Sequence, residues 1–141
     1  MADAATITGA CLCGGVRFSS TAPPVTARTC WCRLCQAIGA GSATVNVGFR
    51  TEHVTIEGEL ADYPAVADSG NHMHRRFCPT CGVHLFSEAE ARPHMIFIRA
   101  GALDDPELGK PTSTIWVSEA PSWACIDPDL PQFPGQPPPA G

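Results

Sequence analysis

Short stretches in which apolar and polar side chains alternate recur along the chain and predict β-strands, because successive side chains of a strand point to opposite faces. Two such stretches, residues 6–13 and 16–20, are separated by a Gly-Gly pair at 14–15. This pair is typical of a tight hairpin turn, in which both central residues need positive φ. On the predicted hairpin, Cys11 and Cys13 face the same side.

Further short strands are expected where an alternating or apolar run recurs, at residues 25–28, 43–49, 53–57, 60–63, 84–87, 94–99 and 114–117. Gly48 is expected to form a bulge. The stretch 94–99 is almost continuously apolar and is expected to be a central strand. Residues 33–38, followed by Gly39, predict a single helical turn. Glycine and proline, 13 and 14 of 141 residues, divide the chain into such short elements, so the fold is predicted to be mainly β.

One domain is expected over residues 5–134, because no break in composition separates two cores. The Pro-rich end, residues 135–141, has too few apolar side chains to offset the entropy of ordering and is expected to be mobile. The formal net charge of -5 argues against binding to nucleic acid, and no run of 18 apolar residues predicts a membrane span. No secretory signal is visible at the start, so the protein is expected in the cytoplasm.

Eight cysteines in a reducing compartment indicate metal binding rather than a disulfide framework. Residues 78–82, Cys-Pro-Thr-Cys-Gly, have the sequence of a zinc knuckle, whose turn brings two sulfurs together while backbone N–H groups donate to them. With the hairpin pair Cys11 and Cys13, the knuckle cysteines Cys78 and Cys81 would complete a closed four-cysteine zinc site. Two small buried residues in a strand are the alternative for the hairpin pair, and a redox dithiol is the alternative for the knuckle.

A second group, Cys30, Cys32 and Cys35, lies within a single stretch of six residues, 30–35. If Cys30 and Cys32 lie on an extended segment, their sulfurs share one face, and a tight turn returns Cys35 toward them. Three thiolates fill three corners of a zinc tetrahedron and leave the fourth open, as in a catalytic site. The alternative is a structural zinc closed by a fourth protein ligand, for which the candidates are His53, His72, His74 and Cys125.

Arginines flank these cysteine groups, at Arg28, Arg33, Arg75 and Arg76. A guanidinium group can bind a carboxylate through two parallel hydrogen bonds, so these four are candidate substrate-binding residues. A solvated surface position is the competing interpretation for each of them.

With its three cysteine groups in this order and spacing, the sequence resembles the glutathione-dependent formaldehyde-activating enzyme family, whose domain is shared with centromere protein V. The stretches that carry the resemblance are residues 9–18, 30–35, 76–82 and 130–133. The resemblance implies a mainly β, Mss4-like (β-tent) fold of short antiparallel strands held together by zinc. It implies two Zn²⁺ ions, a structural one on Cys11, Cys13, Cys78 and Cys81 and a catalytic one on Cys30, Cys32 and Cys35.

The activity implied by the resemblance is that of a carbon-sulfur lyase of the S-(hydroxymethyl)glutathione synthase type, acting on glutathione and formaldehyde. Two positions depart from the family, because Trp31 and Thr114 stand where histidine is common. A water in the open zinc position would instead favour a zinc hydrolase acting on another small electrophile. A zinc-stabilised binding module without catalysis is a further alternative, and a protein ligand at the fourth position would favour it.

Overall fold

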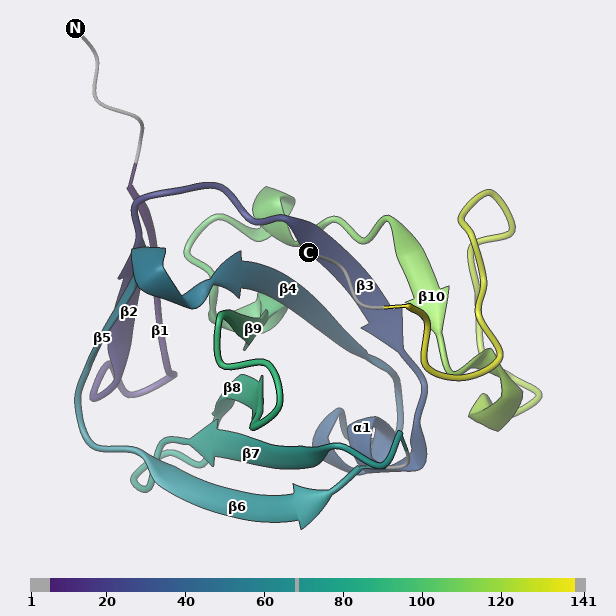
Figure 1. Ribbon diagram of the computed structural model, residues 1–141, viewed down its shortest axis with the longest axis horizontal. Helices are drawn as coiled ribbons and strands as arrows, with labels where there is room; N and C mark the ends of the chain where they lie inside the picture. Colours follow the sequence, from purple (N-terminus) through teal and green to yellow (C-terminus); the bar gives the residue numbers. More distant parts are fainter. Residues whose placement is uncertain (1–5, 68, 139–141) are drawn as a thin grey trace, which may run out of the picture.

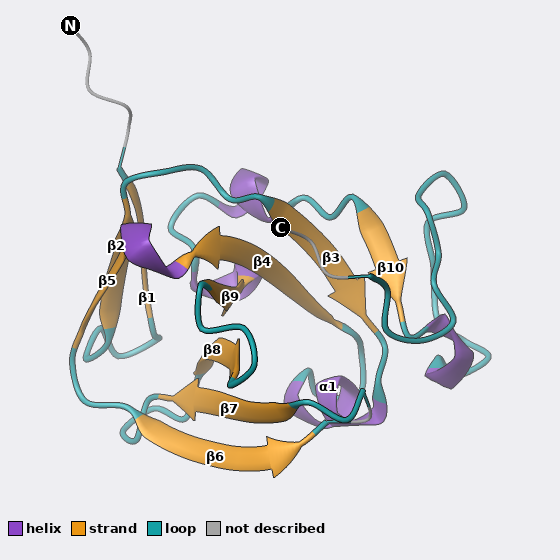
Figure 2. Ribbon diagram, viewed as in Figure 1, coloured by secondary structure: helices purple, strands orange, loops and turns teal. Residues whose placement is uncertain are grey.

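The computed structural model describes residues 6–67 and 69–138, which form two β-sheets joined by short helices and loops (Figures 1 and 2). The smaller sheet has the order β1 (Ile7–Ala10), β2 (Arg17–Ser20) and β5 (Val54–Glu57). The larger sheet has the order β10 (Ser113–Ile115), β3 (Thr26–Cys30), β4 (Thr44–Arg50), β9 (Met95–Arg99), β8 (His84–Ala89), β7 (His72–Phe77) and β6 (Ala61–Val66). The predicted mainly β fold is therefore confirmed.

Neighbouring strands pair antiparallel, except that β10 runs parallel to β3. The helix α1 (Arg33–Ile38) coincides with the predicted helical turn, and Gly39 ends it by donating its N–H to the Cys35 carbonyl. Among the described residues, four short 3-10 helices complete the fold: η1 (Thr51–His53), η2 (Ala100–Ala102), η3 (Pro106–Gly109) and η4 (Val117–Glu119). In the part of the chain that the structure describes, no helix has the length and apolar character needed to cross a membrane.

The larger sheet bends back on itself, so that β3 and β4 lie opposite β6 and β7 (Figure 1). One of its faces packs against the smaller sheet, where the rings of Phe18 on β2 and Phe86 on β8 meet edge to face at 5.5 Å. On β9, Ile96 and Ile98 point into this core. The alternate side chains of the same strand therefore point to the opposite face, where the cavity described below lies.

The hairpin of β1 and β2 forms as predicted, but its turn differs from the prediction. Ala10 pairs with Arg17, so the connection is a six-residue loop over residues 11–16 rather than a two-residue Gly-Gly turn. Within the loop only Gly14 has a positive φ, of 78°. The longer loop lets two backbone N–H groups reach the sulfur atoms, which a tight turn could not do.

Gly48 does not form the predicted bulge. The pairing of β4 continues without a shift on both sides of this residue, with Thr26 on β3 and Phe97 on β9 as its partners. A Cβ atom at position 48 would lie 2.7 Å from the Thr26 methyl and 2.9 Å from the Phe97 ring. Glycine therefore serves here to admit the neighbouring side chains, and not to kink the strand.

The strand at 94–99 is central, as predicted, because β9 lies between β4 and β8. The strand predicted at 60–63 continues through Pro64 to Val66, which is possible because β6 is an edge strand. At the other end of the chain, Gly135 accepts a hydrogen bond from the N–H of Trp116 at 3.4 Å. The mobility predicted for 135–141 remains a prediction, and residues 139–141 of that segment lie outside the described residues.

Candidate metal centres and ligand cavity

Four cysteines from two distant loops meet beside the smaller sheet: Cys11, Cys13, Cys78 and Cys81. Their sulfur atoms all lie within 4.8 Å of one another. The Val16 N–H donates to the sulfur of Cys11 at 3.2 Å, and the N–H groups of Thr80 and Cys81 each donate to that of Cys78 at 3.4 Å. Hydrogen-bond donors of this kind stabilise thiolates, and four thiolates are the ligands of a closed zinc site.

Cys30, Cys32 and Cys35 form the second cluster, with sulfur atoms also within 4.8 Å of one another. Cys30 ends β3, and Cys32 caps α1, where its sulfur accepts the N–H of Cys35 at 3.4 Å. Hydrogen bonds from Cys30 and Cys32 lower the pKa of the Cys35 thiol to about 2. The pKa of the Cys30 thiol is raised instead, because this thiol contacts those of Cys32 and Cys35. Ionisation of one thiol thus disfavours ionisation of its neighbours, and a bound cation would let all three ionise together.

No fourth ligand joins this second cluster among the His, Cys, Asp and Glu side chains of residues 6–67 and 69–138. His53, His72, His74 and Cys125, the candidates suggested by the sequence, all lie outside it. His74 is held elsewhere, between Asp62 at 2.7 Å and Glu90 at 2.8 Å. The described residues therefore leave the fourth coordination position of the cluster free of protein ligands.

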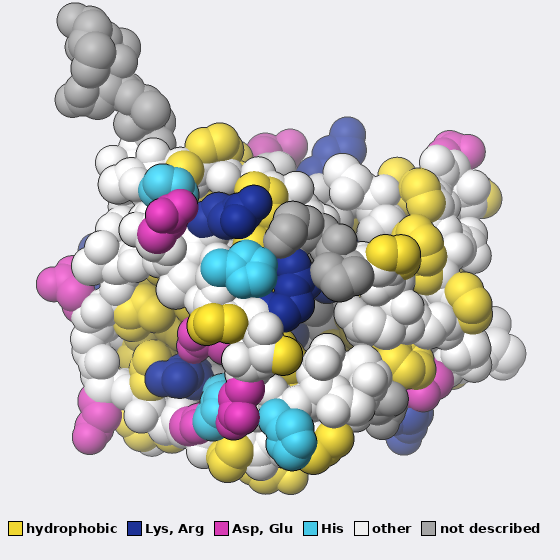
Figure 3. All heavy atoms as spheres, viewed as in Figure 1, with side chains coloured by type: hydrophobic (Ala, Val, Ile, Leu, Met, Phe, Trp, Pro, Cys, Tyr) yellow, Lys and Arg dark blue, Asp and Glu magenta, His cyan; other side chains and the backbone are white. Residues whose placement is uncertain are grey.

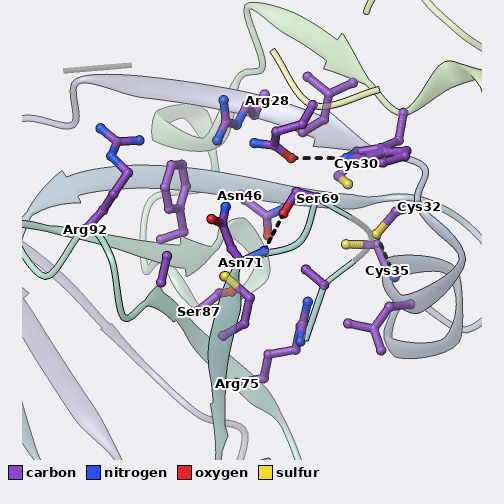
Figure 4. Close-up of a pocket in the computed structure, with 18 of the residues that line it drawn as sticks. Arg28, Cys30, Cys32, Cys35, Asn46, Ser69, Asn71, Arg75, Ser87 and Arg92 are labelled. Carbon is purple, nitrogen blue, oxygen red and sulfur yellow. Dashed lines mark hydrogen bonds between the residues drawn. The ribbon is translucent and has the colours of Figure 1, made fainter. Parts of the chain in front are cut away.

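A cavity of about 170 Å³ adjoins the three-cysteine cluster, on the face of the larger sheet turned away from the core. Figure 4 shows the three cysteines at one end of it and Arg92 at the other. Its walls include the apolar side chains of Leu34, Met73, Met95, Phe97, Ile115 and Trp116. Trp116, in the left-handed backbone conformation with φ 58°, packs with Phe133 against the cysteines. The cluster thus lies at one end of a partly apolar chamber.

Two of the four candidate arginines, Arg28 and Arg75, line this cavity. Arg33 does not, because its exposed side chain lies on α1 and donates to Gln36 at 2.6 Å. Arg76 points to the other face of β7, where its Nε lies 3.1 Å from a Glu88 carboxylate oxygen. Arg33 and Arg76 therefore lie outside the cavity, whereas Arg28 and Arg75 lie within it. Because neighbouring side chains of a strand point to opposite faces, a strand predicted here would have placed Arg75 and Arg76 on different faces.

Arg92 and Arg99 also line the cavity, although the sequence did not single them out. Arg99 donates through Nη1 to Asn46, and Arg28 lies over the Phe97 ring, 4.8 Å from its centre. Arg28 and Arg75 are only 9% and 6% exposed, and this burial lowers the pKa of both. None of the described residues that line the cavity is acidic. Figure 3 shows basic side chains set in the hollowed centre of this face, although the whole chain carries a net charge of -5.

The two departures from the family, Trp31 and Thr114, lie away from this chamber. Together with Cys125 they line a second cavity, of about 220 Å³, on the other side of β3. The buried ring of Trp31 meets Trp123 edge to face at 6.2 Å. Neither departure therefore removes an acid or base from the cavity beside the three-cysteine cluster.

The fold and its two cysteine clusters define a class of small β proteins with paired sites suited to metal ions. The family model described as "Glutathione-dependent formaldehyde-activating enzyme" matches residues 6–119. The chain belongs to this family, as its resemblance indicated, and has the family's Mss4-like fold.

No curated protein matches the chain. Among solved structures, the chain is similar to a Rhodobacter sphaeroides protein whose crystal structure was determined as a Northeast Structural Genomics target. The TM-score is 0.57 at 22% sequence identity, over 74% of this chain and 96% of that one. This similarity supports the fold alone.

Proposed function

We propose that the protein is a zinc-dependent carbon-sulfur lyase of the S-(hydroxymethyl)glutathione synthase type, acting on glutathione or a similar thiol and on a small aldehyde such as formaldehyde. The observation that carries this proposal is the three-cysteine cluster, which has no fourth ligand among the described residues and adjoins a cavity. A binding module would need no such opening. In the reaction, a sulfur-carbon bond forms as the carbonyl double bond opens, and the thiol proton ends on the new hydroxyl; the reverse reaction releases both substrates.

The residues present fit two zinc ions, a structural one on the four-cysteine cluster and a catalytic one on the three-cysteine cluster. Zinc in the second cluster would stabilise the thiolate form of a substrate thiol at neutral pH, and so supply the nucleophile. Ile115, Trp116 and Phe133 pack against these cysteines and exclude water from one side of the site. Arg28, Arg75 and Arg99 attract an anionic substrate.

We expect two zinc ions per chain that differ in their resistance to chelators. The four-cysteine cluster would surround its ion on all sides, whereas a chelator can approach the three-cysteine cluster through its free position. Elemental analysis during mild chelation should therefore show one zinc leaving before the other. A single zinc in the fully metallated chain would contradict the assignment.

Zinc-loaded protein is expected to accelerate exchange between glutathione, formaldehyde and their adduct, and Cys32→Ser is expected to lose this acceleration, because it removes one of only three ligands. Thiol addition to formaldehyde already proceeds in water, so the measurement is NMR exchange spectroscopy on the equilibrated mixture, against the protein-free rate. Cys125→Ser is the matched control, since Cys125 is exposed and outside both clusters.

Equal exchange rates with the wild type and Cys32→Ser would show that this substrate pair is wrong. If the protein binds glutathione but does not accelerate the exchange, the substrate at the same site would be another small electrophile, as in the hydrolase alternative.

A further inference from the structure

A buried glutamine ties the segment that carries the three-cysteine cluster, 30–35, to a distant part of the chain. Gln36 follows the last of these cysteines on α1 and is only 4% exposed. Its Nε2 donates to the Trp31 carbonyl at 2.7 Å and to the Glu119 carbonyl at 3.0 Å. Its Oε1 accepts Nη1 of Arg33 at 2.6 Å, so both ends of the amide have partners. One side chain thus links the cysteine segment to η4.

The side chain of Glu119 makes a second link between the same two segments. Its Oε1 accepts the N–H of Arg33, the first residue of α1, at 2.8 Å. This N–H has no possible partner within the helix, because the first N–H groups of a helix have no preceding carbonyl in reach. In addition, the N–H of Trp31 donates to the Ile115 carbonyl at 3.1 Å. The cysteine segment is therefore held at both Trp31 and Arg33.

These hydrogen bonds end on backbone atoms between the cysteines. Trp31 separates Cys30 from Cys32, and Arg33 lies between Cys32 and Cys35. The bonds therefore fix the path of the segment without using a sulfur atom. If the segment became ordered only on binding an ion, the loss of conformational entropy would weaken the binding. A site with three protein ligands has one ligand fewer than a closed site to offset this loss.

The same turn of the chain also carries a wall of the cavity. The N–H of Glu119 donates to the carbonyl of Trp116 at 3.0 Å, and Trp116 lines the cavity and packs against the three-cysteine cluster. Its left-handed backbone conformation is one that residues other than glycine keep only where their surroundings hold it. Its indole N–H donates to Gln136 at 3.1 Å. Glu119 thus relates the position of this ring to that of the cysteines.

We propose that Glu119 and Gln36 are positioning residues of the three-cysteine site, which hold the cysteine segment in the geometry that binds zinc and keep Trp116 in place beside it. Both act through the backbone of the segment and not as metal ligands. The inference rests on the proposed function only for the catalytic use of the zinc, because the effect on metal binding can be measured without a substrate.

The test is the release of zinc from the fully loaded chain at increasing chelator concentration, followed by elemental analysis, with the four-cysteine site as the internal reference. We expect Glu119→Ala to weaken zinc binding at the three-cysteine site about 10- to 100-fold, the usual cost of losing a group that orients metal ligands. The four-cysteine site should be unchanged. Glu119→Gln should restore most of the affinity, since its amide oxygen can still accept the N–H of Arg33.

Gln36→Met provides a second variant should Glu119→Ala fail to fold. Methionine has a similar length but cannot donate to the two carbonyls, so the same selective loss of zinc is expected. Glu107→Ala, at an exposed position on η3, is the matched control and should release both ions as the wild type does.

Cobalt(II) in place of zinc at the three-cysteine site gives a readout that a merely structural role would not change, because its absorption spectrum depends on the geometry of its ligands. The absorption bands should shift in Glu119→Ala and return to the wild-type positions in Glu119→Gln. A residue that only stabilises the fold would lower the melting temperature and leave the spectrum unchanged.

Equal weakening of zinc binding at both sites would overturn the proposal, and so would unchanged release from the three-cysteine site in Glu119→Ala and Gln36→Met. A selective loss from the three-cysteine site in both variants would support it. If that loss is found in a protein that does not accelerate the exchange of glutathione and formaldehyde, the positioning role holds while the proposed lyase activity fails.

Discussion

Replacing Cys78 with serine is expected to unfold the protein or make it aggregate. Cys78 is 2% exposed, and its sulfur accepts two backbone N–H groups within the four-cysteine cluster. Metal binding to closed zinc sites of small domains is worth about 10–16 kcal/mol, and the whole stability of a domain is about 5–15 kcal/mol. Loss of one ligand from such a site therefore removes a large part of the folding free energy.

Circular dichroism and thermal melting of the purified variant, with zinc content measured in parallel, test this expectation. Cys32→Ser is the matched control, because it removes one sulfur from the other cluster and should leave a folded protein that melts cooperatively. The reverse pattern, a folded Cys78→Ser and an unfolded Cys32→Ser, would show that the two clusters exchange roles.

Gly58→Ala is expected to destabilise the protein more strongly than the addition of a single methyl group suggests. Gly58 follows β5 with a φ of 111°, and a Cβ atom there would lie 2.1 Å from the Gly15 carbonyl oxygen and 3.0 Å from the Val16 Cα. Both contacts are backbone atoms of the loop that holds Cys11 and Cys13, so relief of the clash would displace that loop. The variant should therefore lose zinc from the four-cysteine cluster more readily.

Gly41→Ala is the control that separates two effects of Gly58→Ala, the clash with the neighbouring loop and the strain of a side chain at positive φ. Gly41 has a similar φ of 101°, but no atom lies within 4 Å of a Cβ built there. We expect Gly41→Ala to cost about 1–2 kcal/mol, the penalty for a side chain at positive φ. Gly58→Ala should exceed it by about 2 kcal/mol or more in urea unfolding. Equal losses for the two variants would mean that the loop adapts to the methyl group without cost.

Spacing of the cysteines predicted the three-cysteine cluster, because a single short segment brings these sulfurs together. The four-cysteine cluster was predicted by matching two half-sites, each with two of the four ligands, and only the fold brings these distant half-sites together. The sequence could not predict the length of the loop that carries Cys11 and Cys13, since the Gly-Gly pair is equally typical of a tight turn. Strand β7 was not predicted at all. Its sequence, His-Met-His-Arg-Arg-Phe, lacks apolar alternation because its inner face, which carries Met73 and Arg75, lines the cavity rather than the core.

Arg99 was missed for a related reason. Both faces of β9 are buried, since Ile96 and Ile98 are as enclosed as Met95 and Arg99, so the pattern alone does not say which face lines a cavity. Arg92 lies in a loop, for which alternation gives no signal. Parallel pairing of β10 with β3 likewise depends on a contact between distant segments, as Thr114 with Thr29, that no local pattern encodes.

The two clusters differ in how far apart their members lie along the chain. The three-cysteine cluster comes from one short segment, 30–35, whereas the four-cysteine cluster joins Cys13 to Cys78 across 65 positions. During synthesis on the ribosome, the short segment emerges complete and can capture zinc while the second half of the chain does not yet exist. The distant pair can capture zinc only after Cys78 and Cys81 have emerged. The ligands of the site proposed for catalysis are thus complete at an earlier stage of synthesis than those of the four-cysteine site, and we expect the first site to be able to bind metal before the second.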